Sequence, residues 1–530
     1  MEKKDLYLKI AMKQIPRILT LADRDVSSPT YGCFDREYWH YGTADFPCGM
    51  SQEFVLPLAL VYKHEFRENP YYKQETVKDL VIAGIGFAEK SSHRDGSCDD
   101  YFPFERAYGA TAFSLYAFAE SCRLLGIKEN KTLDFLEKRG KWLSSHSESG
   151  KLTNHHAIAG LALLVLWQLT GKKHYRKTAL EKINLCLSWQ SGEGWFSEYE
   201  GCDPGYLTMT IDFLARAYSI TKGNSLLESL KKALEFLECF VYPDGTCGGE
   251  LGSRDTYLFM PHGFELLAKE CPKAVEIKTR YLKALENGLA TNYEDNRIFG
   301  HMTYSHLLSW LDYCGLRGDS GHRQFRKSFP EAGLYVEKKG RYFFAVSAPK
   351  GGVFKVFRDE KLIHADSGFL CEFSDGKISV SNRVSARAHS GSDPCHIKGI
   401  FYYYKRRFMS PAKQVVFRLT LIVLGPFPCI SKAFRKVLQK ILITGKKEAP
   451  LSFERRFSLE EDGLVVTDLL LLTGGKTVNR LYSTTDKVSV YIAMAECFNR
   501  NMLMKWRQFA EDEVKDLNKA RKLEITRRFE

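Results

Sequence analysis

Three short turns of one kind recur in the first part of the chain, and each precedes a stretch with helical periodicity. A turn that recurs at one end of successive helix pairs is typical of stacked helical hairpins. If the stack closes on itself, it forms an α/α toroid whose loops open on one face; the open alternative is an α-solenoid that binds another protein. The turns are Asp95-Gly-Ser-Cys-Asp-Asp-Tyr101, Glu193-Gly-Trp-Phe-Ser-Glu-Tyr199 and Asp244-Gly-Thr-Cys-Gly-Gly-Glu250.

The hydrophobic period changes near residue 330. Before it, residues 1–50 predict one helix and an aromatic-rich loop, and apolar residues then recur every three or four positions. After it, short alternating stretches are separated by Gly, Asp and Ser turns, which is typical of an antiparallel β domain. The predicted helices lie within 53–66, 76–89, 107–125, 156–169, 175–189, 207–220, 226–240, 258–269, 277–288 and 304–313, and the predicted strands within 333–347, 352–358, 368–373, 377–381, 452–457, 463–468 and 488–491.

This change of period predicts a multidomain chain, first α and then β. An α/α toroid (an incomplete helical barrel) is expected at 1–325 and an antiparallel β-sandwich at 326–500. A basic amphipathic insertion interrupts the β domain at 405–447, and a charged helix is expected at 501–530. The 530 residues, of which 44% are hydrophobic, are enough for two or three domains.

The insertion alternates apolar and basic residues. Its first apolar run, 415–424, is too short to span a bilayer and contains Arg418. We therefore predict an element that lies in the interface of an anionic membrane; the alternative is a helical hairpin packed on the sandwich. The basic residues on which this prediction depends are Arg406, Arg407, Arg418, Lys432, Arg435, Lys436, Lys440, Lys446 and Lys447.

The net charge indicates which classes of partner the protein could bind, and the spacing of its cysteines indicates the redox compartment. A formal net charge of +13 favours an acidic partner, namely an acidic polysaccharide or oligosaccharide or an anionic membrane surface, and no nucleic-acid partner is expected. The 14 cysteines lack paired spacing, which fits a reducing compartment. The charged N-terminus has no apolar stretch of the secretory kind, so we expect a cytoplasmic protein, peripheral on the inner face of a membrane if the insertion binds lipid. No cofactor can be inferred, and a structural divalent metal stays open.

The stretch Asn154-His155-His156 stands where a Ser/Gly-rich break leads into the apolar run 161–167. An amide and titratable imidazoles at the mouth of a buried helix suit a site that holds a carboxylate and moves a proton. The simpler alternative is that Asn154 caps the helix and the histidines line its first turn.

The repeat loops add further candidates, because each presents a tyrosine near a helix start and two of them also carry an arginine. A single tyrosine in such a place is more commonly a packing residue, so the recurrence carries the prediction. His262 and His301 are weaker candidates, with a core position as the alternative. The predicted catalytic residues are Asn154, His155, His156, Tyr206 and Tyr257, and the predicted substrate-binding residues are Glu105, Arg106, Tyr108 and Arg254.

A helical toroid followed by a β-sandwich resembles the polysaccharide lyases of the heparinase II/III and alginate-lyase type, over roughly residues 50–490. Thr153-Asn154-His155-His156 is similar to their Asn-Asn-His-Gly stretch, although Ala157 replaces the glycine, and the register can place either Asn154 with His155 or His155 with His156. His364-Ala-Asp-Ser-Gly368 is similar to the acidic-Gly segment of their β domain. The resemblance implies β-elimination on a uronic-acid-containing glycan. An enzyme without a secretory signal would meet oligosaccharides, or lipid-linked glycan at the inner membrane face, so we expect a role in polysaccharide biosynthesis or export.

Other functions remain open on the same scaffold. A C5-epimerase shares the first proton abstraction, and a glycosidase would use a carboxylate pair such as Glu198 with Glu200. A non-catalytic glycan-binding or assembly protein would differ in that Asn154, His155 and the repeat-loop side chains do not converge. The chain contains no GxGxxG, P-loop, HExxH or GxSxG motif that would favour another class of enzyme.

Overall fold

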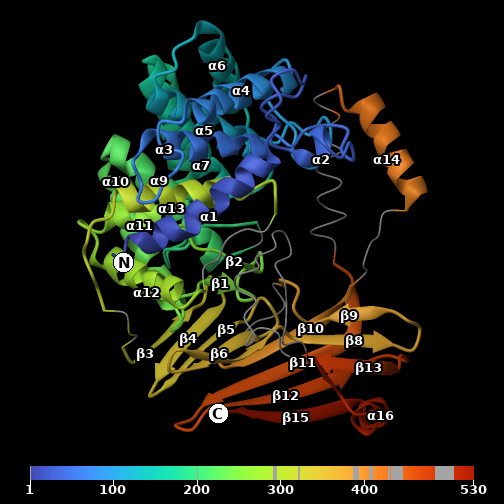
Figure 1. Cartoon of the computed structure of the whole chain (residues 1–530). Helices are drawn as coiled ribbons and strands as arrows, with labels where there is room; N and C mark the ends of the chain where they lie inside the picture. Colours follow the sequence, from blue (N-terminus) through green and yellow to red (C-terminus); the bar gives the residue numbers. More distant parts are fainter. Residues whose placement is uncertain are drawn as a thin grey trace.

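The computed structural model describes residues 2–199, 201–289, 295–319, 321, 323–385, 393–404, 410–427, 430, 446–483 and 506–530. Figure 1 shows a helical body packed over antiparallel sheets, with the helix α14 standing apart at one side. The predicted strand at 488–491 and much of the 405–447 insertion lie outside the described residues.

An inner ring of helices forms the first domain. Each inner helix contacts the next, and α13 contacts α3, which closes the ring. This arrangement confirms the predicted α/α toroid. The inner helices are α3 (Val55–Lys63), α5 (Tyr108–Leu125), α7 (Thr153–Thr170), α9 (Pro204–Thr221), α11 (His262–Leu267) and α13 (Gly300–Leu311).

An outer layer of helices covers this ring, and each outer helix packs against an inner one. The outer partner of α13 is α1, so the N-terminal helix completes the last hairpin from the other end of the chain. The outer helices are α1 (Asp5–Leu21), α4 (Glu75–Ser91), α6 (Asn130–Ser145), α8 (Lys173–Ser188), α10 (Asn224–Leu237) and α12 (Pro272–Glu286); the short elements α2 (Arg36–Trp39), η1 (Ser51–Phe54), η2 (Glu238–Phe240), β1 (Gly248–Gly249) and β2 (Thr256–Tyr257) lie in the connections.

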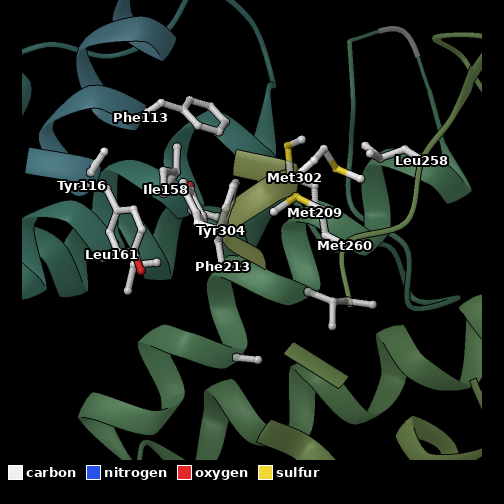
Figure 2. Packing of buried hydrophobic residues seen from close by; sticks show 14 of the residues in the cluster. Phe113, Tyr116, Ile158, Leu161, Met209, Phe213, Leu258, Met260, Met302 and Tyr304 are labelled. Carbon is white, nitrogen blue, oxygen red and sulfur yellow. The ribbon is translucent and has the colours of Figure 1, made fainter. Parts of the chain in front are cut away.

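The axis of the toroid is filled by side chains. Figure 2 shows Phe113 and Tyr116 of α5, Met209 and Phe213 of α9 and Tyr304 of α13 lying together between the inner helices. All five are buried. A candidate site therefore lies at the end of the toroid, where the loops are, and not along its axis.

The repeated turns connect outer helices to inner helices, and their glycines have a steric reason. Gly96, Gly194 and Gly245 all have positive φ, between +83° and +105°, which residues with a Cβ adopt at a cost. Each also lies against the backbone of the next outer helix, so the turns lock neighbouring hairpins together. A Cβ would approach Arg139 at Gly96, Lys232 at Gly194 and Arg280 at Gly245, at 2.7, 2.3 and 2.2 Å from the nearest backbone atom.

The described strands of the second domain form two antiparallel sheets. The first has the order β3-β4-β5-β6-β7 and the second the order β14-β13-β8-β9-β10-β11-β12-β15. The strands of the first sheet are β3 (Phe325–Phe329), β4 (Leu334–Lys339), β5 (Tyr342–Ser347), β6 (Val353–Arg358) and β7 (Lys361–Asp366); those of the second are β8 (Phe369–Phe373), β9 (Ile378–Val380), β10 (His396–Tyr404), β11 (Glu448–Leu459), β12 (Leu464–Leu472), β13 (Val478–Ser483), β14 (Arg507–Gln508) and β15 (Lys522–Phe529).

The first sheet is a middle layer whose central strands β5 and β6 are buried on both faces. Along β5, Phe344 and Val346 pack against the second sheet, which confirms the predicted sandwich. The alternate residues Phe343 and Ala345 belong to the core of the helical domain. Since side chains alternate across a strand, Lys355 of β6 points to the toroid together with Phe357. The middle sheet thus brings a buried lysine to the toroid.

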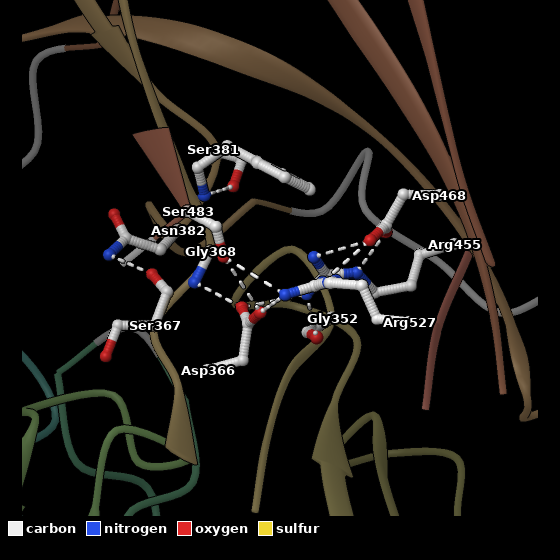
Figure 3. A network of polar contacts seen from close by, with 11 residues as sticks. Gly352, Asp366, Ser367, Gly368, Ser381, Asn382, Arg455, Asp468, Ser483 and Arg527 are labelled. Atoms are coloured by element: carbon white, nitrogen blue, oxygen red, sulfur yellow. Dashed lines mark hydrogen bonds and ion pairs between the residues drawn. The ribbon is translucent and has the colours of Figure 1, made fainter. Parts of the chain in front are cut away.

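A buried ion-pair network holds the sandwich together (Figure 3). Arg455 lies between Asp366 and Asp468, at 3.1 and 2.5 Å, and Arg527 bonds the same two carboxylates from the other side. Although burial raises the pKa of Asp366, the two arginines more than offset this and hold it well below its usual range. The acidic-Gly segment 364–368 therefore serves here as a structural anchor between the sheets.

The structure differs from the sequence prediction in the C-terminal tail and in one helix of the toroid. The tail is not one helix: α16 (Glu511–Ala520) is followed by β15, which pairs with β12 along its length. Leu523, Ile525 and Phe529 lie on the one face of β15 that packs on the sandwich core and alternate with exposed polar residues, which explains why the strand joins the sheet. The helix α6 escaped prediction because charged residues interrupt its apolar pattern. No helix within the described ranges is both long and apolar enough to cross a membrane.

The turn glycines give the first prediction. Gly245→Ala places a Cβ against Arg280, whereas Gly150→Ala, at φ +92° with nothing within 4 Å, adds strain alone. We expect the control to lose about 1 kcal/mol of the free energy of unfolding and Gly245→Ala to lose a further ~1–3 kcal/mol. Denaturant unfolding of both variants measures this, and equal losses would contradict the role assigned to the close approach.

Candidate functional site

The loops that connect outer to inner helices meet around one buried carboxylate, that of Glu198. Its Oε1 accepts hydrogen bonds from Asn154 Nδ2 at 2.5 Å and from Arg254 Nη1 at 2.9 Å. Asn154 comes from the first turn of α7, Arg254 from the turn between β1 and β2, and Glu198 from the loop before α9. Two loops and the start of α7 thus bring an amide, a cation and an anion together on one face of the toroid.

The guanidinium of Arg254 is held in a fixed plane. It lies over the ring of Tyr206 at 3.9 Å and over the ring of Tyr199 at 4.6 Å. Its backbone N–H donates to Asp203, whose other carboxylate oxygen caps α9 at the N–H of Tyr206. Burial raises the pKa of Asp203 to about 7. These contacts orient the arginine before any ligand arrives, which lowers the entropic cost of binding an anion.

A carboxylate–histidine pair lies next to this cluster. Glu148 Oε2 is 2.9 Å from Nδ1 of His155, with the glutamate side chain 1% exposed and the histidine side chain 23% exposed. When Nδ1–H donates to the carboxylate, the lone pair is on Nε2, and the ring can accept a proton there. The pair therefore has the arrangement of a general base with its orienting group.

Two residues of the first repeat loop interact electrostatically with this site: Asp100 with His155, and Tyr101 with Arg254. Burial raises the pKa of Asp100 to about 6, although the nearby Arg297 and His155 lower it. The charge of Asp100 in turn raises the pKa of Tyr101, whose ring is also within reach of Tyr206 and Arg254. Glu105 holds this loop, because its carboxylate accepts the backbone N–H groups of Asp100 and Tyr101 at 3.2 and 2.8 Å.

These residues place groups that can accept or donate a proton next to the guanidinium of Arg254, which can bind an anion. The arrangement includes an oriented imidazole, a carboxyl group with a raised pKa and an arginine stacked between tyrosines. Burial also raises the pKa of Tyr206, which the charge of Arg254 partly offsets, so its hydroxyl stays protonated at neutral pH. Such a set can neutralise a substrate carboxylate, accept one proton and donate another.

Asn154 does not cap α7, so that part of the structural alternative is wrong, whereas His155 and His156 do lie in the first turn of the helix. The cap position is Leu152, which makes no side-chain capping bond, and Asn154 lies inside the first turn with its amide on Glu198. The two adjacent imidazoles lie in different surroundings. His155 reaches the Glu148 pair, whereas His156 is 1% exposed and packs between the rings of Tyr108 and Trp189.

Several predicted site residues are not brought to the cluster. Tyr108 is buried with His156, and within the described part of the chain neither its hydroxyl nor either nitrogen of His156 has a hydrogen-bond partner. Tyr257 donates to Glu250 and is bonded by Lys355 of the middle sheet. Arg106 donates to the carbonyl of Gly425 at the end of α14, so it holds another element rather than the cluster.

The weaker histidine candidates are engaged in the interior. His262 accepts a hydrogen bond from Arg216 at Nδ1, and its Nε2 is 2.7 Å from Asp312. His301 pairs with the buried Glu53 at 2.9 Å. Both rings lie among the inner helices, as their core alternative predicted.

Glu148 and Asp100 are the site residues that the sequence analysis missed, and Glu198 appeared there only as part of a carboxylate pair with Glu200, which lies outside the described residues. No local signal marked Glu148. Gly150, in the loop between α6 and α7, has φ +92° like the glycines of the three turns, but nothing lies within 4 Å of its Cβ position, so this loop lacks the close backbone approach of those turns.

The described residues contain no group of three His, Cys, Asp or Glu side chains placed to hold a metal ion. The structural divalent metal considered from the sequence remains a prediction. The cluster around Glu198 offers one carboxylate with an amide and a guanidinium, and this donor set suits an anion rather than a cation.

No protein-family model matches the sequence, and no curated protein matches it. The fold is similar to solved polysaccharide lyases. The xanthan lyase of Paenibacillus superposes with a TM-score of 0.53 at 10% identity, over 91% of this chain and 47% of that one. The chondroitin AC lyase of Streptomyces coelicolor A3, solved in complex with chondroitin sulphate, gives a TM-score of 0.50 at 8% identity, over 95% and 76%. The chain spans about half the length of the xanthan lyase, and the comparison confirms the lyase fold.

The buried His156 gives a prediction for the pH dependence of stability. Burial lowers its pKa to about 4, with a smaller contribution from Lys182. Below about pH 6.5 the unfolded chain takes up a proton that the folded chain refuses until about pH 4, so the free energy of unfolding falls as the pH drops through this window. His156→Leu should therefore show a shallower fall of Tm with pH than the wild type. Parallel curves for the two proteins would contradict the assignment.

Proposed function

We propose that the protein is a carbohydrate-active enzyme of the polysaccharide-lyase type that cleaves an acidic, uronic-acid-containing glycan by β-elimination. The observation that carries the proposal is the convergence of Asn154 and Arg254 on Glu198 beside the Glu148–His155 pair. A non-catalytic relative was expected to lack this convergence, so the geometry favours an enzyme.

The chemistry assigns a role to each group. Arg254, oriented by Glu198 and the tyrosine rings, and Asn154 bind the uronate carboxylate and lower its negative charge, which makes the C5 proton more acidic. His155 Nε2 takes that proton. The electron pair of the C5–H bond forms the C4=C5 double bond, the C4–O bond breaks, and the leaving oxygen takes a proton from the hydroxyl of Tyr206.

A glycosidase is the second candidate, and Asp100 is the observation that favours it. A carboxyl group with a pKa raised to about 6 stays partly protonated near neutral pH, as a general acid for glycoside hydrolysis must. A hydrolase adds water and leaves saturated ends, whereas elimination leaves a conjugated unsaturated end. A C5-epimerase would use the same base without cleaving the chain.

An anionic membrane surface is the second partner that we propose, with the protein peripheral on the inner face of the cytoplasmic membrane. This proposal depends on the basic character of the 405–447 insertion. It agrees with a role in the biosynthesis or export of a glycan, where substrate is present at a membrane.

The reaction is tested with a panel of uronate polymers, read by the ultraviolet absorbance of the unsaturated product. We expect absorbance to rise with at least one polymer, and His155→Ala and Glu148→Gln to lower kcat on that polymer by roughly 10²–10⁴-fold and by a smaller factor, respectively. His174→Ala, on the exposed face of α8, is the matched control and should retain wild-type turnover.

The outcomes separate the candidates. New reducing ends without absorbance would replace the lyase by the glycosidase, and solvent hydrogen exchange at C5 without cleavage would replace it by the epimerase. If no polymer is altered in any of these ways, the enzyme proposal fails.

Asn154→Ala separates a role in substrate binding from a role in stability. Loss of a donor to the developing negative charge should lower turnover by about 10²–10³-fold, whereas loss of a hydrogen bond to a charged group costs the fold about 1.5–3 kcal/mol. Turnover and Tm are measured on the same variant, with Asn154→Asp as a partner of similar shape. A variant that melts lower but turns over normally would make Asn154 a structural residue.

A further inference from the structure

The helix α14 (Pro411–Leu424) is amphipathic in the opposite sense to an ordinary surface helix. Such helices bury their apolar face and expose the polar one. Here Phe417, Arg418 and Leu421 lie on the face toward the protein. Lys413 and Gln414 are exposed near the start of the helix, but from Val415 to its end every exposed side chain is aliphatic. The most exposed of these are Val415, Val416, Leu419, Ile422 and Val423, each 57–64% exposed, and Phe427 extends the patch just beyond the helix.

The inward contacts attach α14 to the loop face of the toroid. Phe417 packs edge-on against Phe102, and Arg418 pairs with Asp45 at 3.1 Å. Arg106 bonds the carbonyl of Gly425 at the end of the helix. The first repeat loop, which also carries Asp100 and Tyr101, therefore supports the helix. Figure 1 shows α14 beside α2, far from the sheets between whose strands it is inserted.

The sequence around α14 has an extreme charge balance. Between Lys405 and Lys447 there are eleven Lys or Arg residues and no Asp or Glu, although the whole chain has 77 basic and 64 acidic residues. An aliphatic surface with basic residues before and after it is complementary to an anionic lipid interface, which offers both hydrocarbon and negative charge. The same balance disfavours pairing of this segment with its copy in a second chain, because like charges would meet.

We infer that the outward face of α14 lies in the interface of an anionic bilayer and fixes the loop face of the toroid beside the membrane. This inference makes the membrane partner proposed above more specific, because it says which face of which helix contacts the bilayer and how the toroid is oriented on it. It depends on that partner but not on the glycan reaction, since lipid binding is measured without any glycan. With this orientation the site would take a glycan presented at the membrane surface.

The test is flotation of the full-length protein with vesicles of phosphatidylcholine alone or mixed equally with phosphatidylglycerol, at low and high salt. The variant Val416→Ser/Leu419→Ser/Val423→Ser removes apolar surface from the exposed face. The matched control Val26→Ser/Leu185→Ser/Leu316→Ser removes the same kind of surface from exposed positions elsewhere.

We expect the wild type and the control to float with the anionic vesicles and to bind more weakly at high salt. The α14 variant should bind roughly tenfold more weakly or worse, because each aliphatic side chain contributes to partitioning. Circular dichroism and Tm of the variants should match the wild type, because the changed side chains are exposed.

Equal binding of the wild type and the α14 variant would overturn the inference, and so would equal binding to both kinds of vesicle. The wild type could instead fail to bind vesicles and form a dimer, while the α14 variant is a monomer. The face would then be an interface between two copies of the chain, and the inference would be wrong. None of these outcomes bears on the polymer assay, so a failure here is distinct from a failure of the proposed enzyme.

Discussion

Two buried lysines, Lys355 of β6 and Lys350 in the turn between β5 and β6, fix the loop on which the candidate site depends. Lys355 bonds Glu250 at 2.6 Å and also contacts the hydroxyl of Tyr257, and Lys350 bonds Asp255 at 2.6 Å. These acceptors flank Arg254 in the turn between β1 and β2. Removing one partner of a buried pair leaves an uncompensated charge and costs about 3–5 kcal/mol. The sheet therefore holds the loop in one conformation, including the strained φ of +54° at Asp255.

Other contacts in the molecule also fix the positions of the loops that form the candidate site. The turn glycines lock each outer helix to the next, so the loops leave the toroid at fixed places. The apolar axis keeps the inner helices at a set separation, and the Asp366–Arg455 network holds the second sheet against the middle sheet. The cluster around Glu198 is therefore assembled by three segments far apart in the sequence, each positioned by a separate contact with its neighbours.

Much of the fold could be predicted from the sequence, because its determinants are local. The run 207–220 has helical period over its whole length, and α9 spans Pro204–Thr221. The helix α6 could not be found in this way, since its buried residues are few and charged residues surround them. The strand β15 was hidden by its charges, because it is an edge strand whose outward face is polar. The site was predictable in part: Asn154, Arg254 and Tyr206 were named from their loops, but the partner of His155 and the burial of His156 depend on tertiary packing that no local pattern records.

The central claim is that the loop face of the toroid binds a uronate so that its carboxylate meets Arg254 and Asn154 and its C5 faces His155. The most direct test is a crystal structure of the His155→Ala variant with a uronate oligosaccharide taken from a polymer that the wild type cleaves. We predict a sugar carboxylate within hydrogen-bond distance of Arg254, with C5 directed at the space left by the imidazole. A sugar bound elsewhere on the protein, or in the same place with its carboxylate turned to solvent, would contradict the account.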